Sequence, residues 1–401
     1  MAEARIIARV LDSPLEIDAA VWNALLARQS RPTPFMRHEY LAALHASGSA
    51  TPATGWTPRF MGLWAGAELL AACPLYVKSH SYGEYVFDWA WANAYAQHGL
   101  AYYPKAVVAV PFTPVPGTRL LARDQALRVQ LLQAVRDWCE RQGLSSLHLL
   151  FGADEDLQAA QELGLLQRHT VQFHWRNQSP AGTPYRDFDD FLQHLSQDKR
   201  KKIRQERRRV AEAGVRFRWL RGRDIGPADW DFFYRCYERT YLEHGNPPYL
   251  TRAFFRLQAE QMPEAWLLFV AERAGRPIAS SLIAISADPS LTNGQKDHEF
   301  VAYGRYWGAL ERVDCLHFEA CYYQPLAWCI AHGVQRFEGG AQGEHKMARA
   351  LLPVPTHSAH WLAHPAFADA VERFLLREGA AVQGYLDELQ ARSPLRQRKQ
   401  V

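Results

Sequence analysis

The chain has 401 residues, of which 48% are hydrophobic and 22% charged, with a formal net charge of +4. This length exceeds that of a typical domain and predicts two. The small charge does not indicate nucleic-acid or membrane binding by itself, and no run of about 20 apolar residues predicts a membrane span. The first residues, MAEARIIARVLDSPLE, carry charges where a secretory signal has an apolar core, so we expect a cytoplasmic protein.

The first predicted elements are two apolar runs on either side of Ala65-Gly66, in MGLWAGAELLAACPLYV, which are typical of a β-hairpin. An aromatic-rich segment follows, with eight aromatic residues among the 22 from Tyr82 to Tyr103. Rings with a few cations suit stacking on sugars or bases, so we predict that Tyr103, Lys105 and Arg119 contact a ligand. Alternatively, the rings pack between the two halves of the chain.

The first half closes with an apolar-periodic helix that ends in Trp-Cys-Glu-Arg-Gln-Gly (138–143), followed by the strand-like run SSLHLLF. A glycine just after the last helical turn is a typical helix end. The segment NQSPAGTPYRD (177–187) is rich in turn-forming residues. It predicts a boundary between a first domain, 1–182, and a second, 183–401.

The segment KRKKIRQERRR (199–209) has eight cationic residues in eleven and predicts a helix near 197–213. Only Ile203 and Val210 form an apolar line on it, and we expect Glu206 to form an ion pair within the helix. Such a helix suits binding of phosphate groups in tRNA or in a nucleotide-linked molecule. A solvated helix without a ligand is equally compatible with the pattern.

The second half repeats the order of the first. A predicted hairpin, WLLFVAERAGRPIASSLIAI, turns near Ala274-Gly275 and is followed by a strand (298–310), a helix (316–333) and the strand-like VQRFEGG. The helix ends in Trp-Cys-Ile-Ala-His-Gly (328–333), which matches 138–143, and Pro325 either kinks it or marks its first turn. Two matches in the same order predict an internal duplication of an α/β unit.

The order hairpin, strand, helix, strand resembles the core of the GNAT acyltransferase fold, and two copies in one chain resemble the Fem-type transferases. A closer resemblance, to the bacterial FemAB-like "peptidoglycan biosynthesis" branch, rests on WANAYAQHGLAYYPK (91–105), PFTPVPGTRLL (111–121), HFEACYYQ (317–324) and GAQGEHK (340–346). The resemblance implies an α/β fold of two tandem GNAT-like domains. It also implies transfer of an acyl or aminoacyl group to an amine, on a peptidoglycan precursor or another small amine.

In a GNAT domain two central parallel strands separate and the acyl donor enters between them. The resemblance therefore places the site in the second half, at the start of the helix and the end of the last strand. The candidates are His317, Glu319, Tyr322, Tyr323, Gln324, Glu338, Gln342, Glu344, His345 and Lys346. Transfer to an amine needs a base, for which Glu319 or Glu338 comes first and His345 next. Tyr322 or Tyr323 could protonate the leaving group.

The other candidates, His317, Gln324, Gln342, Glu344 and Lys346, are predicted to bind substrate. A purely structural interpretation is also open, in which His317 and Glu319 cap the helix and the two tyrosines belong to the core. The spacings of His and Glu match no standard zinc motif, so we expect no metal.

Two acyl donors are compatible with the sequence. The GNAT phosphate loop, Q/R-x-x-G-x-G/A, survives only in part as Arg305-Tyr306-Trp307-Gly308-Ala309-Leu310, with Arg305 and Gly308 as the remaining cofactor contacts. Acetyl-CoA or another acyl-CoA is one donor. Aminoacyl-tRNA, the donor of Fem-type enzymes, is the alternative and does not need that loop. A non-catalytic protein that binds a cell-wall precursor is the rival interpretation from another functional class.

Overall fold

The computed structural model describes residues 5–286, 299–341 and 343–395. The chain forms two compact units, each assembled from three stretches of sequence. Unit 1 comprises Met1–Thr170, Tyr249–Phe254 and Pro355–Gly384, and unit 2 comprises Val171–Pro248, Phe255–Val354 and Tyr385–Val401. Within the described ranges, no helix has the length and apolar character needed to cross a membrane.

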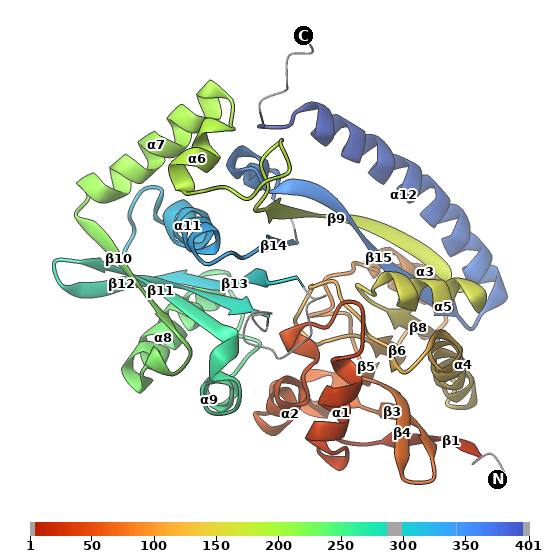
Figure 1. The fold of residues 1–401 in the computed structure, drawn as a ribbon. Coiled ribbons are helices and arrows are strands. Elements are labelled where there is room, and N and C mark those ends of the chain that lie inside the picture. Colours follow the sequence, from red (N-terminus) through yellow and green to blue (C-terminus); the bar gives the residue numbers. More distant parts are fainter. Residues whose placement is uncertain (1–4, 287–298, 342, 396–401) are drawn as a thin grey trace. The chain divides into compact units, whose positions relative to one another are not determined.

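Unit 1 contains two sheets, a four-stranded one in the order β1-β3-β4-β7 and a second in the order β15-β8-β6-β5-β2 (Figure 1). The strands of unit 1 are β1 (Ile6–Leu11), β2 (Trp56–Pro58), β3 (Phe60–Ala65), β4 (Glu68–Cys73), β5 (Leu75–Lys78), β6 (Lys105–Val108), β7 (Leu121–Ala122) and β8 (Ser146–Leu149), with part of β15 (Leu352–Leu362). Its helices are α1 (Ala19–Leu26), α2 (His38–Ala46), α3 (Trp89–Gln97), α4 (Gln125–Arg141) and α5 (Asp154–Glu162), with most of α12 (Pro365–Ala391).

Unit 2 has the strand order β10-β11-β12-β13-β14-β9. Its strands are β10 (Val215–Arg221), β11 (Trp266–Arg273), β12 (Arg276–Ile285), β13 (Val301–Ala309), β14 (Arg336–Ala341) and part of β9 (Leu166–Arg176). Its helices are α6 (Phe188–Gln193), α7 (Gln197–Glu212), α8 (Pro227–Glu243), most of α9 (Arg252–Gln261), α10 (Leu316–Phe318), the π-helical segment η6 (Glu319–Tyr323), α11 (Gln324–Ala331) and the 3-10 segment η7 (Glu344–Arg349).

The two units repeat one topology, as the sequence predicted. Both hairpins are present and turn at a glycine with positive φ, Gly66 in unit 1 and Gly275 in unit 2. In unit 1, Arg59 and Pro74 divide the hairpin strands, so that β3 pairs with β4 while β2 pairs with β5. The next strand is antiparallel to the hairpin (β6 to β5, β13 to β12), and a parallel strand follows the helix (β8 beside β6, β14 beside β13).

The repeated Trp-Cys-x-x-x-Gly motif forms the same helix end twice. Gly143 and Gly333 adopt positive φ, 65° and 68°. The next residue's N–H then donates to the carbonyl of the motif's buried cysteine, Cys139 in α4 and Cys329 in α11, at 3.1 and 2.9 Å. This is the bonding pattern of a glycine-terminated helix. The motif therefore encodes a buried anchor and a helix stop.

In each unit, the strand beside the second parallel strand comes from the other half of the sequence. Strand β9 follows β8 and α5 in the chain, yet its residues 172–176 pair antiparallel with β14 in unit 2. Strand β15 follows β14, yet its residues 359–362 pair antiparallel with β8 in unit 1. The fold class predicted from the sequence, two tandem GNAT-like units, is thus confirmed, with one strand of each unit coming from the other half.

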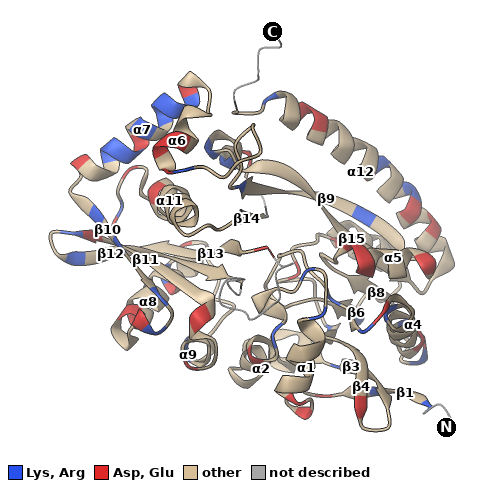
Figure 2. Ribbon diagram, viewed as in Figure 1, with Lys and Arg blue, Asp and Glu red and all other residues tan. Residues whose placement is uncertain are grey.

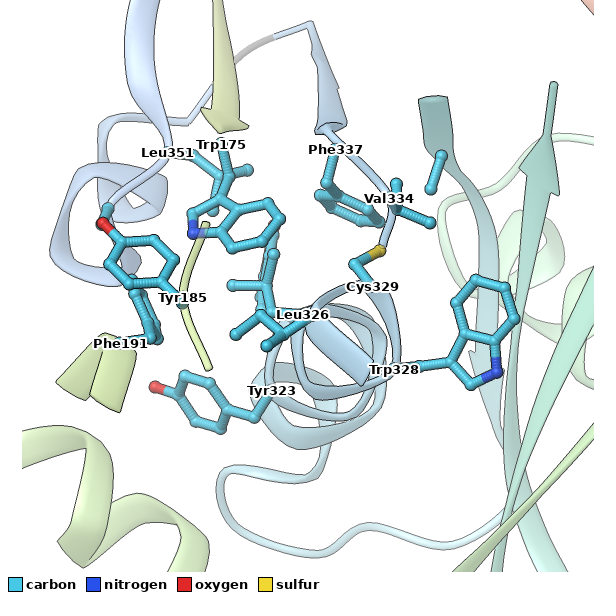
Figure 3. Close-up of a cluster of buried hydrophobic side chains, with 14 of the residues drawn as sticks. Trp175, Tyr185, Phe191, Tyr323, Leu326, Trp328, Cys329, Val334, Phe337 and Leu351 are labelled. Atoms are coloured by element: carbon cyan, nitrogen blue, oxygen red, sulfur yellow. The ribbon is translucent and has the colours of Figure 1, made fainter. Parts of the chain in front are cut away.

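The core of unit 2 surrounds α11. Figure 3 shows Leu326 and Cys329 of this helix among Trp175, Phe337 and Leu351, all nearly or fully buried. Tyr323, at the end of η6, closes one side of the cluster. Because this apolar packing fixes the helix against β14 and β9, the residues at the helix start have a defined position.

Candidate functional site

Strands β13 and β14 are paired only at their beginnings. Their parallel register runs from Val301 opposite Arg336 to Tyr303 opposite Glu338, and β13 then bulges at Arg305, which has no counterpart on β12. Beyond this point a cavity of about 120 Å³ lies beside the two strands. It is lined by Ser281, Ile283, Gly304, Arg305, Tyr306, Trp307, His317, Cys321, Tyr322, Phe337 and Gly339. We call it the crevice.

The helix beside the crevice contains a π-turn at the side chains that the sequence analysis predicted as site residues. Gln324 N–H donates to the Glu319 carbonyl, five residues back, and Pro325 brings no N–H of its own. A π-turn is a common feature of functional sites, and here it lets the helix continue through the proline. The wider turn also stacks Gln324 on Glu319, whose Oε1 accepts a 2.7 Å hydrogen bond from the Gln324 amide.

The π-turn divides the predicted residues between two sides of the helix. His317 and Tyr322 line the crevice. Glu319 and Gln324 instead line a second cavity, beside α7. Tyr323 also faces α7, where its hydroxyl donates to Glu206. The structure therefore brings His317 and Tyr322 together and separates them from Glu319, Tyr323 and Gln324.

His345 completes the group beside the crevice. Its Nε2 lies 3.4 Å from the Tyr322 hydroxyl, and its ring centroid is 6.5 Å from that of His317. His345 is exposed, and partial burial of its ring, together with the charges of Lys346 and Arg349, lowers its pKa. Burial lowers the pKa of His317 further, to about 4, and raises that of Tyr322. At neutral pH both imidazoles are thus uncharged and the tyrosine is protonated.

Sequence reasoning missed Arg349, which holds His345 in place. Its Nη1 donates to the His345 carbonyl at 2.7 Å, and its Nη2 lies 2.8 Å from Glu206 Oε2. The expectation that Glu206 pairs within its own helix was wrong, because this carboxylate turns inward to Arg349 and Tyr323. A single arginine outside the recognised motifs carries no local signal of such a role.

The remaining predicted residues of the second half lie at several depths. Lys346 is buried, donates to the Gly340 carbonyl at 3.1 Å, and has its pKa lowered to about 8 by burial. Glu344 is exposed and accepts a hydrogen bond from Tyr385 at 2.7 Å. Glu338 is buried, with Oε1 3.2 Å from Arg336 Nε and Oε2 3.8 Å from His174. Gln342 lies outside the described residues.

The partial phosphate-loop motif lies inside a strand. Residues 305–309 belong to β13, so they do not form the turn between strand and helix where a phosphate loop would stand. Arg305 lines the crevice. Gly308 has a packing role, because a Cβ there would lie 1.9 Å from the Cys236 carbonyl of α8. The glycine is therefore explained by helix packing without any bound phosphate.

In unit 1, the two cationic side chains that were predicted to contact a ligand are buried and hydrogen-bonded within the protein. Lys105 is fully buried and donates to Ser81 Oγ and Glu84 Oε2, both at 2.8 Å, and to Asp88. Arg119 is also buried and donates to the carbonyls of Val115, Gly117 and Leu150. The Tyr103 hydroxyl lies 2.8 Å from Ser81. Lys105 and Tyr103 thus form part of the packing of the aromatic-rich segment, whereas Arg119 holds the loop from Val115 to Gly117 against Leu150.

The aromatic-rich segment has an inner and an outer set of rings. Trp91, Tyr95 and Tyr102 form a core cluster with Leu362 and with residues of α12. The outer rings Tyr82, Phe87 and Trp89 are 58%, 52% and 40% exposed. Tyr85 and Tyr103 are partly buried, so the outer set offers the most accessible ring surface. Within the described residues, no group of three or more His, Cys, Asp or Glu side chains could hold a metal ion.

A model of the FemAB-like family, described as peptidoglycan biosynthesis/recognition, matches residues 13–397. Among solved structures, FemX is similar with 10% identity and a TM-score of 0.50, over 89% of this chain and 98% of its own. L-PGS from Bacillus licheniformis has 11% identity and a TM-score of 0.52, over 89% and 97%. A C-terminal DUF2156 domain from Agrobacterium fabrum has 10% identity and a TM-score of 0.53, over 90% and 96%.

A search of curated proteins gave no match. The three solved structures share the fold over nearly the full length of both chains. Because the family model covers almost every residue and the structure has the duplicated topology, this protein belongs to the FemAB-like family and consists of two tandem GNAT-like units.

Proposed function

We propose that this protein transfers an acyl or aminoacyl group to an amine of a peptidoglycan precursor or a similar small molecule, and that the reaction takes place at the crevice. The observation that carries the proposal is the separation of two parallel strands beside Tyr322 and His345. A volume of about 120 Å³ suits the reacting acyl group, while the rest of a donor would extend outside.

In this proposal His345 is the base. The amine attacks in its neutral form, after its ammonium group has released one proton to water. The lowered pKa of His345 keeps the imidazole neutral at pH 7, so it takes the second proton from the nitrogen as the C–N bond forms. Tyr322, whose raised pKa keeps it protonated, donates to the departing oxygen or sulfur, and His345 returns a proton to Tyr322. Of the two protons that the nitrogen loses, one thus goes to water and one to the leaving group, and both side chains recover. The neutral ring of His317 supplies a hydrogen bond to the acyl oxygen.

Glu319 and Glu338 are the alternative bases. Burial raises the pKa of Glu319, which favours a base, but its carboxylate is paired with Arg207 at 3.2 Å and faces the second cavity. Glu338 is paired with Arg336 and does not line the crevice. Both positions fit structural ion pairs better than proton transfer, so we place His345 first.

The donor is either an acyl-CoA, such as acetyl-CoA, or an aminoacyl-tRNA. The resemblance to Fem-type proteins favours tRNA, and so does the position of Arg305 and Gly308 inside a strand, since it removes the phosphate-loop argument for coenzyme A. A non-catalytic protein that binds a cell-wall precursor is the second candidate. The exposed rings Tyr82, Phe87 and Trp89 favour it, because they offer a surface on which sugars could stack.

Calorimetry with acetyl-CoA and with charged tRNA, followed by mass spectrometry of a peptidoglycan precursor incubated with the donor that binds, tests the proposal. We expect binding of one donor and a mass increase equal to one acyl or aminoacyl group. Tyr322→Phe and His345→Gln should reduce the product, whereas Tyr385→Phe and His332→Gln, matched changes outside the crevice, should not. Precursor binding without binding of either donor would support the non-catalytic alternative.

A further inference from the structure

A second cavity of unit 2 lies beside α7, on the Glu319 side of the π-turn. Its volume is about 500 Å³, within the range of cavities that hold small organic ligands. It is lined by Asp189, Leu192, Arg204, Arg207, Arg208, Val210, Ala211, Val215, Phe217, Glu319 and Gln324. None of these residues lines the crevice, so the two cavities are separate sites.

One wall of this cavity is apolar. Leu192 of α6, Val210 of α7 and Val215 of β10 are buried, and Phe217 and Ala211 extend the apolar surface toward solvent. A ligand that consisted only of charged groups would gain nothing from such a wall. Contact with it removes apolar ligand surface from water and stabilises the complex.

The other wall carries more positive than negative charge. Arg207 is paired with Glu319 at 3.2 Å, and Arg204 lies 3.8 Å from Asp189. Arg208 has no ion-pair partner within the described part of the chain. Figure 2 shows the positive residues along α7, and Arg200 and Lys201 line an adjoining groove. Three guanidinium groups against two carboxylates leave an excess of one cation.

We propose that this cavity binds an anionic amphiphile, a molecule with one phosphate or carboxylate head on an apolar body. The head would pair with Arg208 at the mouth, and the body would lie on the wall formed by Val210, Val215 and Phe217. Charge complementarity selects the head, and the apolar wall distinguishes this ligand from inorganic phosphate and from nucleic acid. The inference does not depend on the transfer reaction or on its donor.

Titration calorimetry with octyl phosphate and with octanoate, both below their micelle concentrations, tests the proposal. Inorganic phosphate and octyl glucoside serve as probes that have only the head charge or only the chain. We expect binding of at least one anionic amphiphile and much weaker binding of both control probes. Equal binding of inorganic phosphate, or no binding of either amphiphile, would overturn the proposal.

Three variants locate the site. Arg208→Gln should weaken binding by about tenfold, the effect of one charge-assisted hydrogen bond, and Ala211→Glu should weaken it by placing a carboxylate at the apolar edge. Arg209→Gln is the matched control, because Arg209 is exposed on the same helix and does not line the cavity. Equal losses in the Arg208 and Arg209 variants would contradict the assignment. Circular dichroism verifies that each variant is folded.

A further experiment distinguishes binding of a single amphiphile molecule in the cavity from binding of α7 to a lipid surface. Vesicles of phosphatidylcholine with phosphatidylglycerol are mixed with the protein and sedimented. Co-sedimentation that Arg209→Gln weakens as much as Arg208→Gln would identify α7 as a membrane-binding surface and overturn the proposal. Binding of octyl phosphate that only the cavity variants weaken supports it.

Discussion

Glu206 of the basic helix and Arg349 of η7 form a buried ion pair, with Oε2 2.8 Å from Nη2. Arg349 in turn donates to the His345 carbonyl and, through Nε, to the Tyr323 hydroxyl at 3.1 Å. The inner face of α7 is thereby linked to both the π-turn and the segment that carries His345. Helix α7 thus has a structural role besides the charge on its outer face.

Replacing Glu206 with Gln should destabilise unit 2 and displace His345. The buried Arg349 would lose its charged partner, at a cost of roughly 1–3 kcal/mol in the free energy of unfolding. We expect kcat to fall more than KM rises, because substrate contacts at the crevice remain. Denaturant unfolding and steady-state kinetics measure the two effects. Glu212→Gln, on the exposed end of the same helix, is the control, and an equal loss there would argue against a positioning role.

His345→Gln should lower turnover by a factor on the order of 10² to 10⁴, the usual contribution of a general base. Because the pKa of His345 lies below 6.5, the wild-type rate should rise with pH below that value and then level off. The rise reflects deprotonation of the imidazole. The variant should lack this rise in a pH–rate profile, and Tyr322→Phe should keep it with a smaller loss of rate. A rise that persists in His345→Gln would remove this residue as the base.

Glu319→Gln and Glu338→Gln distinguish the alternative bases from structural ion pairs. If one carboxylate is the true base, its variant loses a factor of about 10² to 10⁴ in turnover while substrate affinity survives. In our proposal neither variant shows that loss. Glu338→Gln should instead lower the free energy of unfolding by roughly 1–3 kcal/mol, because Arg336 loses a buried charged partner. Turnover and denaturant unfolding, measured on both variants, decide between the two.

The buried cluster around Lys105 should make the stability of unit 1 depend on pH through Glu84. Burial raises the pKa of Glu84 from 4.5 to about 7, although Lys105 opposes the shift. A carboxyl with a raised folded-state pKa stabilises the fold below its unfolded pKa, and this contribution is lost as pH rises to the folded value. The wild type should therefore lose stability relative to Glu84→Gln between about pH 4.5 and 7. Urea unfolding across this window measures the difference, and a constant difference would contradict it.

Lys201→Gln with Lys202→Gln should weaken binding of charged tRNA, if tRNA is the donor, and reduce the salt dependence of that binding. Both lysines are exposed on α7, so the free energy of unfolding should change little. Arg207 is left intact because it is paired with Glu319. Filter binding at several salt concentrations gives the slope. An unchanged slope would leave the outer face of α7 without a role in tRNA binding.

Local signals in the sequence were sufficient for the elements of the repeated unit, hairpin, helix and following strand, and for their order. The hairpin turns and helix ends depend on the conformational freedom of single glycines, so a short stretch of sequence is enough to predict them. These glycines are Gly66 and Gly275 in the turns and Gly143 and Gly333 at the helix ends. The charge pattern of α7 likewise predicted the helix, and the structure buries the two residues of its apolar line, Ile203 and Val210. Recognition of the duplicated unit followed from these local features.

The family resemblance also put His317, Tyr322 and His345 in one candidate group, but it ranked Glu319 and Glu338 ahead of His345 as the base. A π-turn redistributes side chains around a helix, so whether Glu319 or Tyr322 faces the crevice depended on the turn and on the packing around Pro325. Three other features depend on contacts between residues far apart in the chain. They are the ion pair of the buried Lys105 with Glu84, the pairing of Glu206 with Arg349, and the pairing of β9 with β14 and of β15 with β8. Such contacts leave no periodic or local pattern, since they arise from packing between distant segments, and only the tertiary structure decided them.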